Sequence, residues 1–321
     1  MPAAESMADR GVMVLTSDER DRYRASLDEC VEWHHATKVR KMATAPMRPA
    51  RAKLAAAAYK MLGGYVVEAT ARTFWGREML VALPELVSCQ IYSYGYFEAD
   101  VAAFMLIAVK ESMCVFDVGA HFGFFTLLAA DLVGSGGEVH AFEPTPRTFA
   151  WLARNVSELP HVEVNRRAVW SRQTGLMFRD YGLVKAAFNS HFGARDGSVD
   201  SRQSEFSVRA TTLEAYSQAM NRLPDFIKID AESAELEVLH GLGERILRHQ
   251  PLIALEVGDV AGLADVQPSR QAVEYLISHG YKCYECKSGH FRSHVPAEQY
   301  SYGNLFFVPI SSRVVDELTD R

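Results

Sequence analysis

The segment Val115–Gly123 constrains the fold of this chain more than any other. It reads Val-Phe-Asp-Val-Gly-Ala-His-Phe-Gly, so a short apolar run leads into the spacing Asp-x-Gly-x-x-x-Gly. Gly119 permits a sharp turn off the predicted strand, and Gly123 permits the following helix to begin close to a ligand. A strand, a glycine loop and a helix in this order are typical of α/β domains that bind a nucleotide-like cofactor.

Asp117 discriminates between the cofactors that such a loop can hold. It lies two residues before Gly119, at the predicted end of the strand. A carboxylate there repels a pyrophosphate that needs the helix N-terminus, whereas it suits the cationic amino group of S-adenosylmethionine. The chain also lacks a G-x-x-x-x-G-K-[ST] phosphate loop. The loop therefore favours a cationic cofactor without phosphate.

Glu143 is the second predicted anchor for this cofactor. It follows Gly119 by 24 residues and ends a predicted strand over Glu138–Phe142. A carboxylate at that strand tip can accept hydrogen bonds from both ribose hydroxyls. A third predicted strand, Val162–Val169, is expected to run along the adenine edge. We therefore predict the cofactor-binding residues Asp117, Gly119, Ala120, His121, Gly123, Glu143, Pro144, Arg167, Ala168 and Asp230.

Strands and helices alternate through the second half of the chain. Further strands are predicted over Asp225–Asp230, Leu252–Val257, Tyr281–Glu285 and Asn304–Val308. This alternation indicates a mostly parallel sheet that is covered by helices on both faces. The longest apolar run, Val101–Val109, falls far short of the roughly 20 residues that span a bilayer.

The pattern divides the chain into three parts. Residues 1–16 are predicted to be a disordered tail, 17–90 a helical segment and 91–321 the α/β domain. Helices are expected from a Ser17 cap and over Lys53–Ala71. The helical segment is predicted either to cap the acceptor pocket or to pair two subunits as a homodimer. Within the domain, residues 171–206 are rich in Gly, Ser and Asn and are predicted to be an acceptor-side insertion.

Charge and cysteine content narrow the partners. The net charge of −6 gives no general reason to expect nucleic-acid binding. From Trp33 to Val67 the chain has no acidic residue, which we interpret as a solvated basic face, with a docking surface for an anionic partner as the alternative. Cys283 and Cys286 lack a second ligand pair and are predicted to be strand or turn residues. No secretory pattern begins the chain, so the expected location is cytoplasmic.

With these pieces placed, residues 90–310 resemble the FkbM family of methyltransferases. The resemblance rests on Ile91–Glu98, on Phe226–Gly241 with its Lys-Ile-Asp-Ala-Glu block, on Pro251–Glu256 and on Asn304–Pro309. It implies a class I methyltransferase fold, which is Rossmann-like, with a seven-stranded, mostly parallel sheet whose last strand is antiparallel. It also implies O-methylation of a small-molecule hydroxyl of polyketide, sugar or lipid type, as in secondary metabolism. Ser233 and His121 depart from the Gly and Asn that are common in the family.

The Lys-Ile-Asp-Ala-Glu block supplies the predicted acceptor side. Lys228 and Asp230 alternate on one strand and should project to the same face, and Glu232 begins the next helix. We expect Asp230, or His191 in the insertion, to be the base that removes the hydroxyl proton, with Lys228 setting the state of the carboxylate. A structural role for a buried Lys–Asp pair is the alternative. Glu235 and Glu237 are expected to face solvent.

Four other interpretations are weaker. A resident metal is not predicted, although Asp230, Glu232 and Glu256 could supply oxygen ligands to a divalent cation.

A nucleotide-dependent oxidoreductase is disfavoured by Asp117 and by the missing G-x-G-x-x-G. A binding module that keeps the cofactor pocket without catalysis has only Ser233 in its favour. A nucleic-acid methyltransferase lacks an Asn-Pro-Pro-Tyr-type site.

Overall fold

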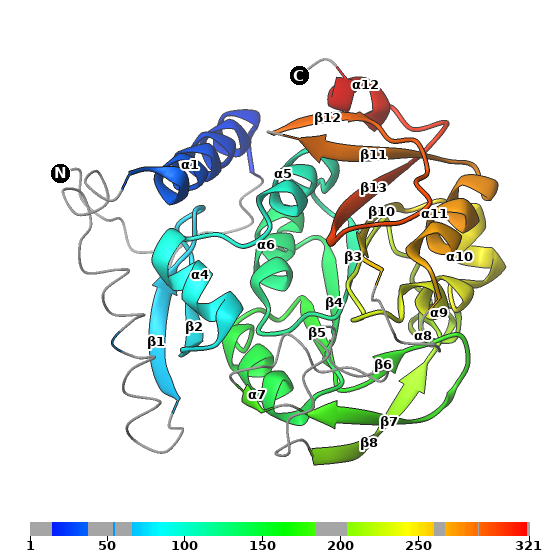
Figure 1. Cartoon of the computed structure of the whole chain (residues 1–321), viewed down its shortest axis with the longest axis horizontal. Helices are drawn as coiled ribbons and strands as arrows, with labels where there is room; N and C mark the ends of the chain where they lie inside the picture. Colours follow the sequence, from blue (N-terminus) through cyan, green and yellow to red (C-terminus); the bar gives the residue numbers. More distant parts are fainter. Residues whose placement is uncertain are drawn as a thin grey trace.

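The computed structural model describes residues 15–37, 54, 66–180, 182–183, 204–259, 267–287 and 289–319. Its main feature is an eight-stranded sheet in the order β12-β11-β13-β10-β9-β3-β4-β5, with helices on both sides (Figure 1). The strands are β3 (Cys114–Val118), β4 (Glu138–Phe142), β5 (Val162–Asn165), β9 (Phe226–Ile229), β10 (Leu252–Val257), β11 (Tyr281–Lys287), β12 (His290–Ser293) and β13 (Gly303–Pro309).

The strand directions confirm the predicted class I methyltransferase architecture. Five central strands, β10-β9-β3-β4-β5, run parallel, and β13 inserts antiparallel beside β10. The predicted count of seven is one too low, because β12 extends the edge beyond β11. The side chains of β12 are mostly exposed, so this strand leaves no apolar alternation in the sequence.

Two apolar cores lie on the two faces of the sheet. On one face lie α5 (Ala99–Ala108), α6 (Phe124–Val133) and α7 (Pro146–Asn155). On the other lie α8 (Leu213–Met220), α9 (Glu235–His240), α10 (Gly243–His249) and α11 (Ser269–Ser278). The central strands are buried on both faces, as the unbroken apolar run Leu252–Ala254 illustrates, and this explains why they lack alternation.

The N-terminal part is only partly helical. Helix α1 (Ser17–His35) confirms the first predicted helix, although Thr16 rather than Ser17 is its cap and forms a capping box with Glu19. The predicted helix over Lys53–Ala71 is wrong at its end, because β1 (Val67–Arg72) pairs antiparallel with β2 (Glu78–Leu83). Of residues 38–65 only Leu54 is described, so most of the acid-free basic stretch lies outside the described residues, as do residues 1–14 of the predicted tail.

The described N-terminal helices pack on the α/β domain. The Arg20 guanidinium on α1 donates to the carbonyl oxygens of Leu106 and Val109 at the end of α5, at 3.2 and 2.7 Å. Helix α4 (Leu86–Tyr94) follows the β1–β2 hairpin and packs against both of its strands. α12 (Val314–Thr319) closes the described chain against α5 and β12. Pairing of two subunits through these helices stays a prediction.

Part of the predicted insertion is regular. β7 (Thr174–Asp180) pairs antiparallel with β8 (Ser204–Thr211), and β6 (Ala168–Val169) joins them in a separate three-stranded sheet. The single strand predicted over Val162–Val169 is therefore two strands, β5 and β6, in different sheets. His191 lies outside the described residues. Cys283 and Cys286 lie in β11 as predicted, and within the described part of the chain no helix is long and apolar enough to cross a membrane.

Candidate active site

A cavity of about 830 Å³ lies at the carboxyl ends of β3, β4, β9 and β10. Ligands of open α/β sheets bind at this edge. Most of the residues predicted from the sequence line it, namely Gly119, Ala120, His121, Glu143, Pro144, Arg167, Ala168, Lys228, Asp230, Glu232 and Glu256. Asp117 and Gly123 are not among the lining residues.

Gly119 holds the loop against the neighbouring strand. Its φ is +77°, and a Cβ added there would lie 1.7 Å from the carbonyl oxygen of Asp230. The amides of Gly119 and Ala120 both donate to the Phe142 carbonyl at 3.0 Å. Glycine is therefore required at position 119, because the backbone that follows β9 approaches too closely for any side chain.

Gly123 lies where helix α6 meets helix α7. Its φ is +93° at the start of α6, and an added Cβ would lie 2.7 Å from Cδ1 of Leu152 on α7. The missing side chain thus serves the packing of α6 against α7, and the expected close approach of a ligand at this residue stays a prediction.

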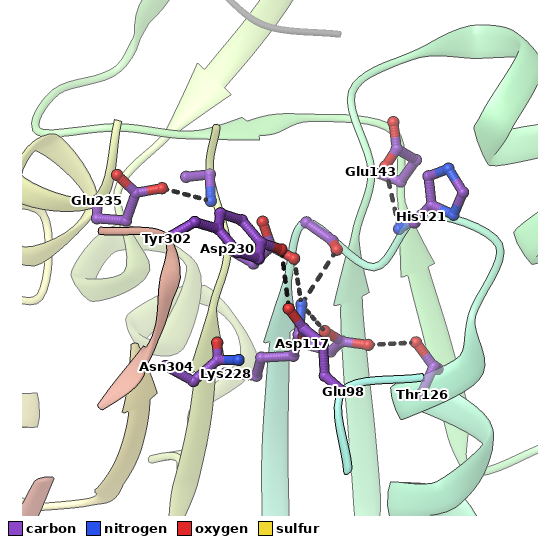
Figure 2. A network of polar contacts seen from close by, with 12 residues as sticks. Glu98, Asp117, His121, Thr126, Glu143, Lys228, Asp230, Glu235, Tyr302 and Asn304 are labelled. Carbon is purple, nitrogen blue, oxygen red and sulfur yellow. Dashed lines mark hydrogen bonds and ion pairs between the residues drawn. The ribbon is translucent and has the colours of Figure 1, made fainter. Parts of the chain in front are cut away.

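Asp117 lies beneath the cavity instead of in its wall. The side chain is 1% exposed. Its Oδ2 accepts a hydrogen bond from Thr126 Oγ1 at 2.6 Å, and its Oδ1 lies 3.8 Å from Lys228 Nζ (Figure 2). Burial raises the pKa of this carboxyl, while Lys228 and Thr126 favour its ionised form. Its carboxylate therefore does not line the cavity, and the expected contact with a methionine amino group stays a prediction.

Glu143 faces the cavity from the tip of β4, where it was predicted. The side chain is 6% exposed. Its Oε2 accepts from the His121 amide at 3.1 Å and its Oε1 accepts from the Thr145 amide at 2.8 Å. Each carboxylate oxygen keeps a further lone pair for a ligand hydroxyl. Burial raises the pKa of Glu143 to about 7, partly offset by the two amide hydrogen bonds.

Lys228 joins the predicted acceptor residues into one charged group. It is 4% exposed, and its Nζ lies 3.0 Å from Asp230 Oδ2 and 3.4 Å from the Gly119 carbonyl (Figure 2). The ammonium also lies over the Phe125 ring, 5.1 Å from its centroid. Burial alone lowers the pKa of Lys228, but the carboxylates of Asp230, Asp117 and Glu98 raise it above the usual value. Lys228 is therefore a permanent cation at this site.

Two residues at the site were not predicted. Tyr302 lines the cavity, and its hydroxyl donates to Glu98 Oε1 at 2.9 Å. Burial and Asp230 raise the pKa of Glu98, while Lys228 lowers it. Glu98 belongs to a segment that only resembles the family, and 204 residues separate it from Tyr302. Sequence alone gives no signal for such a pairing.

The N-terminal segment forms one wall of the cavity. Four side chains of helix α4, Leu86, Val87, Gln90 and Ile91, line it together with Met79 of β2. All but Ile91 precede the predicted domain boundary at position 91. The capping role and the dimer role of this segment both stay predictions.

The turn after Asp230 shows why glycine is favoured at position 233. Glu232 and Ser233 have φ of +50° and +78°, a region that favours glycine. The turn is held by Glu235 Oε1, which accepts from the amides of Ala231 and Ser233, both at 3.1 Å. The expectation that Glu235 faces solvent is therefore wrong, because its carboxylate caps the turn. Ser233 keeps the conformation that glycine would adopt, so it gives no support to a module without catalysis.

The metal alternative finds no support among the described residues. Asp230, Glu232 and Glu256 do not bring ligand atoms together, and the single convergent group in the described ranges is Cys114, Glu138 and His140. Cys114 and Glu138 are the first residues of β3 and β4, so they lie at the amino ends of these strands, whereas the cavity lies at the carboxyl ends. His140 Nδ1 already pairs with the Tyr216 hydroxyl at 2.9 Å, and Arg222 lies 3.3 Å from Glu138. Protein partners thus account for this group.

Comparison with known proteins decides the family. The model of the Methyltransferase FkbM domain matches residues 117–283, slightly more than half of the chain. This chain belongs to the FkbM methyltransferase family. The matched region begins at Asp117 and includes Glu143 and the Lys228–Glu232 block. The predicted resemblance is therefore confirmed.

The individual proteins that resemble this chain share only a small part of its sequence. Hexuronic acid methyltransferase AglP of Haloferax volcanii is 28% identical over 145 residues, which are 45% of this chain and 56% of that protein. The chain thus spans about half the length of this relative. A Methylobacillus flagellatus FkbM methyltransferase structure is 17% identical with a TM-score of 0.38, and covers 70% of this chain and 56% of its own. Aeropyrum pernix fibrillarin with S-adenosylmethionine is 11% identical with a TM-score of 0.39, covering 76% and 99%.

Proposed function

We propose that this FkbM protein transfers a methyl group from S-adenosylmethionine to a hydroxyl group of a small, sugar-type acceptor. The observation that carries the proposal is the pairing of two carboxylates across one cavity. Glu143 faces it from the tip of β4, and Asp230 faces it from the end of β9 with the Lys228 ammonium beside it. The first suits a ribose and the second suits a hydroxyl acceptor.

The chain fits S-adenosylmethionine at the Glu143 end. The two oxygens of Glu143 are fixed by backbone amides and the residue lines the cavity, which suits two vicinal hydroxyls. Ala120, His121 and Pro144 line the adjoining wall, and Arg167 and Ala168 border the expected adenine position. When bound, the cofactor supplies a methyl group already activated on a sulfonium. The chain then needs to align the acceptor and remove its proton.

Asp230 is the proposed immediate proton acceptor. It lines the cavity together with Glu256 and Tyr302. Lys228 holds one of its oxygens at 3.0 Å, which fixes the orientation of the carboxylate. The name of the Haloferax relative, a hexuronic acid methyltransferase, supports a sugar-type acceptor.

Replacement of Asp230 by Asn is expected to lower kcat about 100-fold or more, because the amide keeps the shape but cannot take a proton. The Kd of S-adenosylmethionine should change little. Asp225→Asn, before the other end of β9, is the matched control, since Asp225 accepts from the Cys114 amide and pairs with His249 away from the cavity. Methyl transfer to hexuronic acids, with calorimetry for the donor, gives both values. Full activity of the Asp230 variant would remove its role as base.

Glu143→Gln is expected to weaken S-adenosylmethionine binding about tenfold, through loss of a charge-assisted hydrogen bond. The pKa of Glu143 is raised to about 7, so the carboxylate is mostly ionised only above that pH. The affinity of the unmodified protein should therefore increase as the pH rises through about 7. Calorimetry across this range should show that the pH dependence of the S-adenosylmethionine affinity disappears in Glu143→Gln. It should persist in the control variant Glu163→Gln, because Glu163 is exposed on β5. Equal pH profiles for all three proteins would refute a ribose contact at Glu143.

A further inference from the structure

Three carboxylates surround one buried ammonium at this site. Asp230 and Asp117 lie 3.0 and 3.8 Å from Lys228 Nζ, and Glu98 interacts with Lys228 electrostatically as well. Three negative charges against one positive charge are costly where water is excluded, so one carboxyl group is expected to hold a proton readily. The group therefore has a capacity to store a proton beside the acceptor end of the cavity.

Glu98 is the member best suited to hold that proton. Its Oε2 is buried and has no hydrogen-bond partner among the described residues, while its Oε1 accepts from Tyr302. Asp117 Oδ1 also lacks a hydrogen-bond partner among the described residues, but the Lys228 ammonium lies 3.8 Å from it, and the same ammonium lies 3.0 Å from Asp230 Oδ2. Glu98 also stands before α5 with φ of +39° and makes no side-chain cap bond, so helix capping does not explain it. Backbone strain of this kind is concentrated at functional sites.

Tyr302 connects Glu98 to the cavity. The residue lines the cavity, its hydroxyl donates to Glu98, and it is 61% exposed. Figure 2 shows the Tyr302 side chain extending toward the Glu98 and Asp230 carboxylates. Two residues further along, the Asn304 amide lies 3.3 Å from Asp100 Oδ2, which ties the start of β13 to the turn that carries Glu98. The segments that carry Glu98 and Tyr302 are thus joined by two contacts, Tyr302 to Glu98 and Asn304 to Asp100.

We propose that Glu98 is the proton store of this site and that the Tyr302 hydroxyl relays the proton to it. The inference rests on the proposed function. The acceptor oxygen forms a bond to the methyl carbon as the carbon–sulfur bond breaks, and its proton passes to Asp230. Asp230 then gives a proton to the Tyr302 oxygen while the Tyr302 hydroxyl gives its own proton to Glu98 Oε1. Glu98 ends protonated, Asp230 is restored, and the exposed Tyr302 returns the proton to solvent.

The test compares Glu98→Gln, Tyr302→Phe and the double variant with the unmodified chain. The Glu98→Gln change preserves the local geometry, since its amide oxygen still accepts from Tyr302. Each single variant should lower kcat about tenfold with the KM for S-adenosylmethionine unchanged. The double variant should be no slower than either single variant, because both remove one relay. Glu163→Gln, which alters an exposed carboxyl on β5, is the control and should keep full kcat.

The pH profile of kcat separates a relay from a purely structural contact. The groups facing Glu98 are Asp230, Lys228, Asp100 and Tyr302. Glu98 and Asp230 each accept a proton only when ionised, so kcat should rise with pH at saturating donor. In Glu98→Gln only Asp230 still titrates, so the midpoint of this acidic limb should shift. Additive effects in the double variant, or an unchanged acidic limb, would overturn the relay.

An infrared pH titration tests the proton store without any acceptor. The difference spectrum between the unmodified protein and Glu98→Gln should contain a protonated carboxyl band that disappears as the pH rises. A difference spectrum without that band would overturn the assignment. If the unmodified protein methylates no acceptor but the band is present, the proposed function fails while the proton store at Glu98 stands.

Discussion

Replacing Lys228 with methionine should destabilise the fold by about 3–5 kcal/mol, because the change leaves buried carboxylates without their cation. Lys228 holds Asp230 and Asp117 at 3.0 and 3.8 Å and is itself 4% exposed. Methionine has a similar length and fills the space against Phe125, so lost packing is a small part of the effect. Urea unfolding at neutral pH measures the difference in the free energy of unfolding.

The pH dependence of this variant identifies the cause. The pKa of Asp117 is raised by burial, so its protonated form is favoured in the fold and the resulting stability is lost as the pH rises. The raised pKa of Lys228 keeps the ammonium charged throughout the neutral range, which offsets this loss in the unmodified chain. Lys228→Met should therefore recover stability as the pH falls. Lys282→Met, an exposed change on β11, is the control. A pH-independent loss would point to packing alone.

Replacing Gly119 with alanine should abolish S-adenosylmethionine binding. An added Cβ would lie 1.7 Å from the Asp230 carbonyl oxygen, and the φ of +77° is strained for alanine. Either β3 and β9 separate at their carboxyl ends or the loop moves, and both displace Ala120 and His121, which line the cavity. Loss of binding by more than about 100-fold in calorimetry is the expected result, with a loss of stability of about 1–3 kcal/mol from strain.

Gly175→Ala on β7 is the matched control for this loop. There an added Cβ would meet only Ser207 Oγ, at 3.9 Å. This variant should bind the cofactor as the unmodified chain does. A Gly119→Ala protein that is folded and binds S-adenosylmethionine normally would show that the approach of β3 to β9 does not shape the cofactor site.

Local patterns were enough to predict several of the residues that line the cavity. The alternation of side chains along a strand predicts that Lys228 and Asp230 project to one face. In the structure Lys228 Nζ lies 3.0 Å from Asp230 Oδ2. The spacing from Gly119 to Glu143 placed both at neighbouring strand tips, because consecutive strands of a parallel sheet end at one edge. These inferences depend only on strand periodicity and on the direction of parallel strands.

The remaining features depend on contacts between distant segments. Glu98 and Tyr302 are 204 residues apart, and nothing in either segment specifies the other. The burial of Asp117 follows from the register that pairs it with Lys228, which the position of the strand end alone does not show. Glu235 was assigned to solvent because its helical position is polar, yet the turn at Ser233 needs a backbone cap. The β1–β2 hairpin was missed because Lys53–Ala71 is rich in alanine, which favours helix.

The central claim is methylation of a sugar-type hydroxyl at the cavity between Glu143 and Asp230. Transfer of a radiolabelled methyl group from S-adenosylmethionine to hexuronic acids, followed by mild alkaline treatment, tests it most directly. An ether survives this treatment, whereas a methyl ester on the uronic carboxylate releases its label as methanol. We predict label that survives treatment in the unmodified chain and almost none with Asp230→Asn. Label that alkali releases, or no transfer to any hydroxylated acceptor, would contradict the proposal.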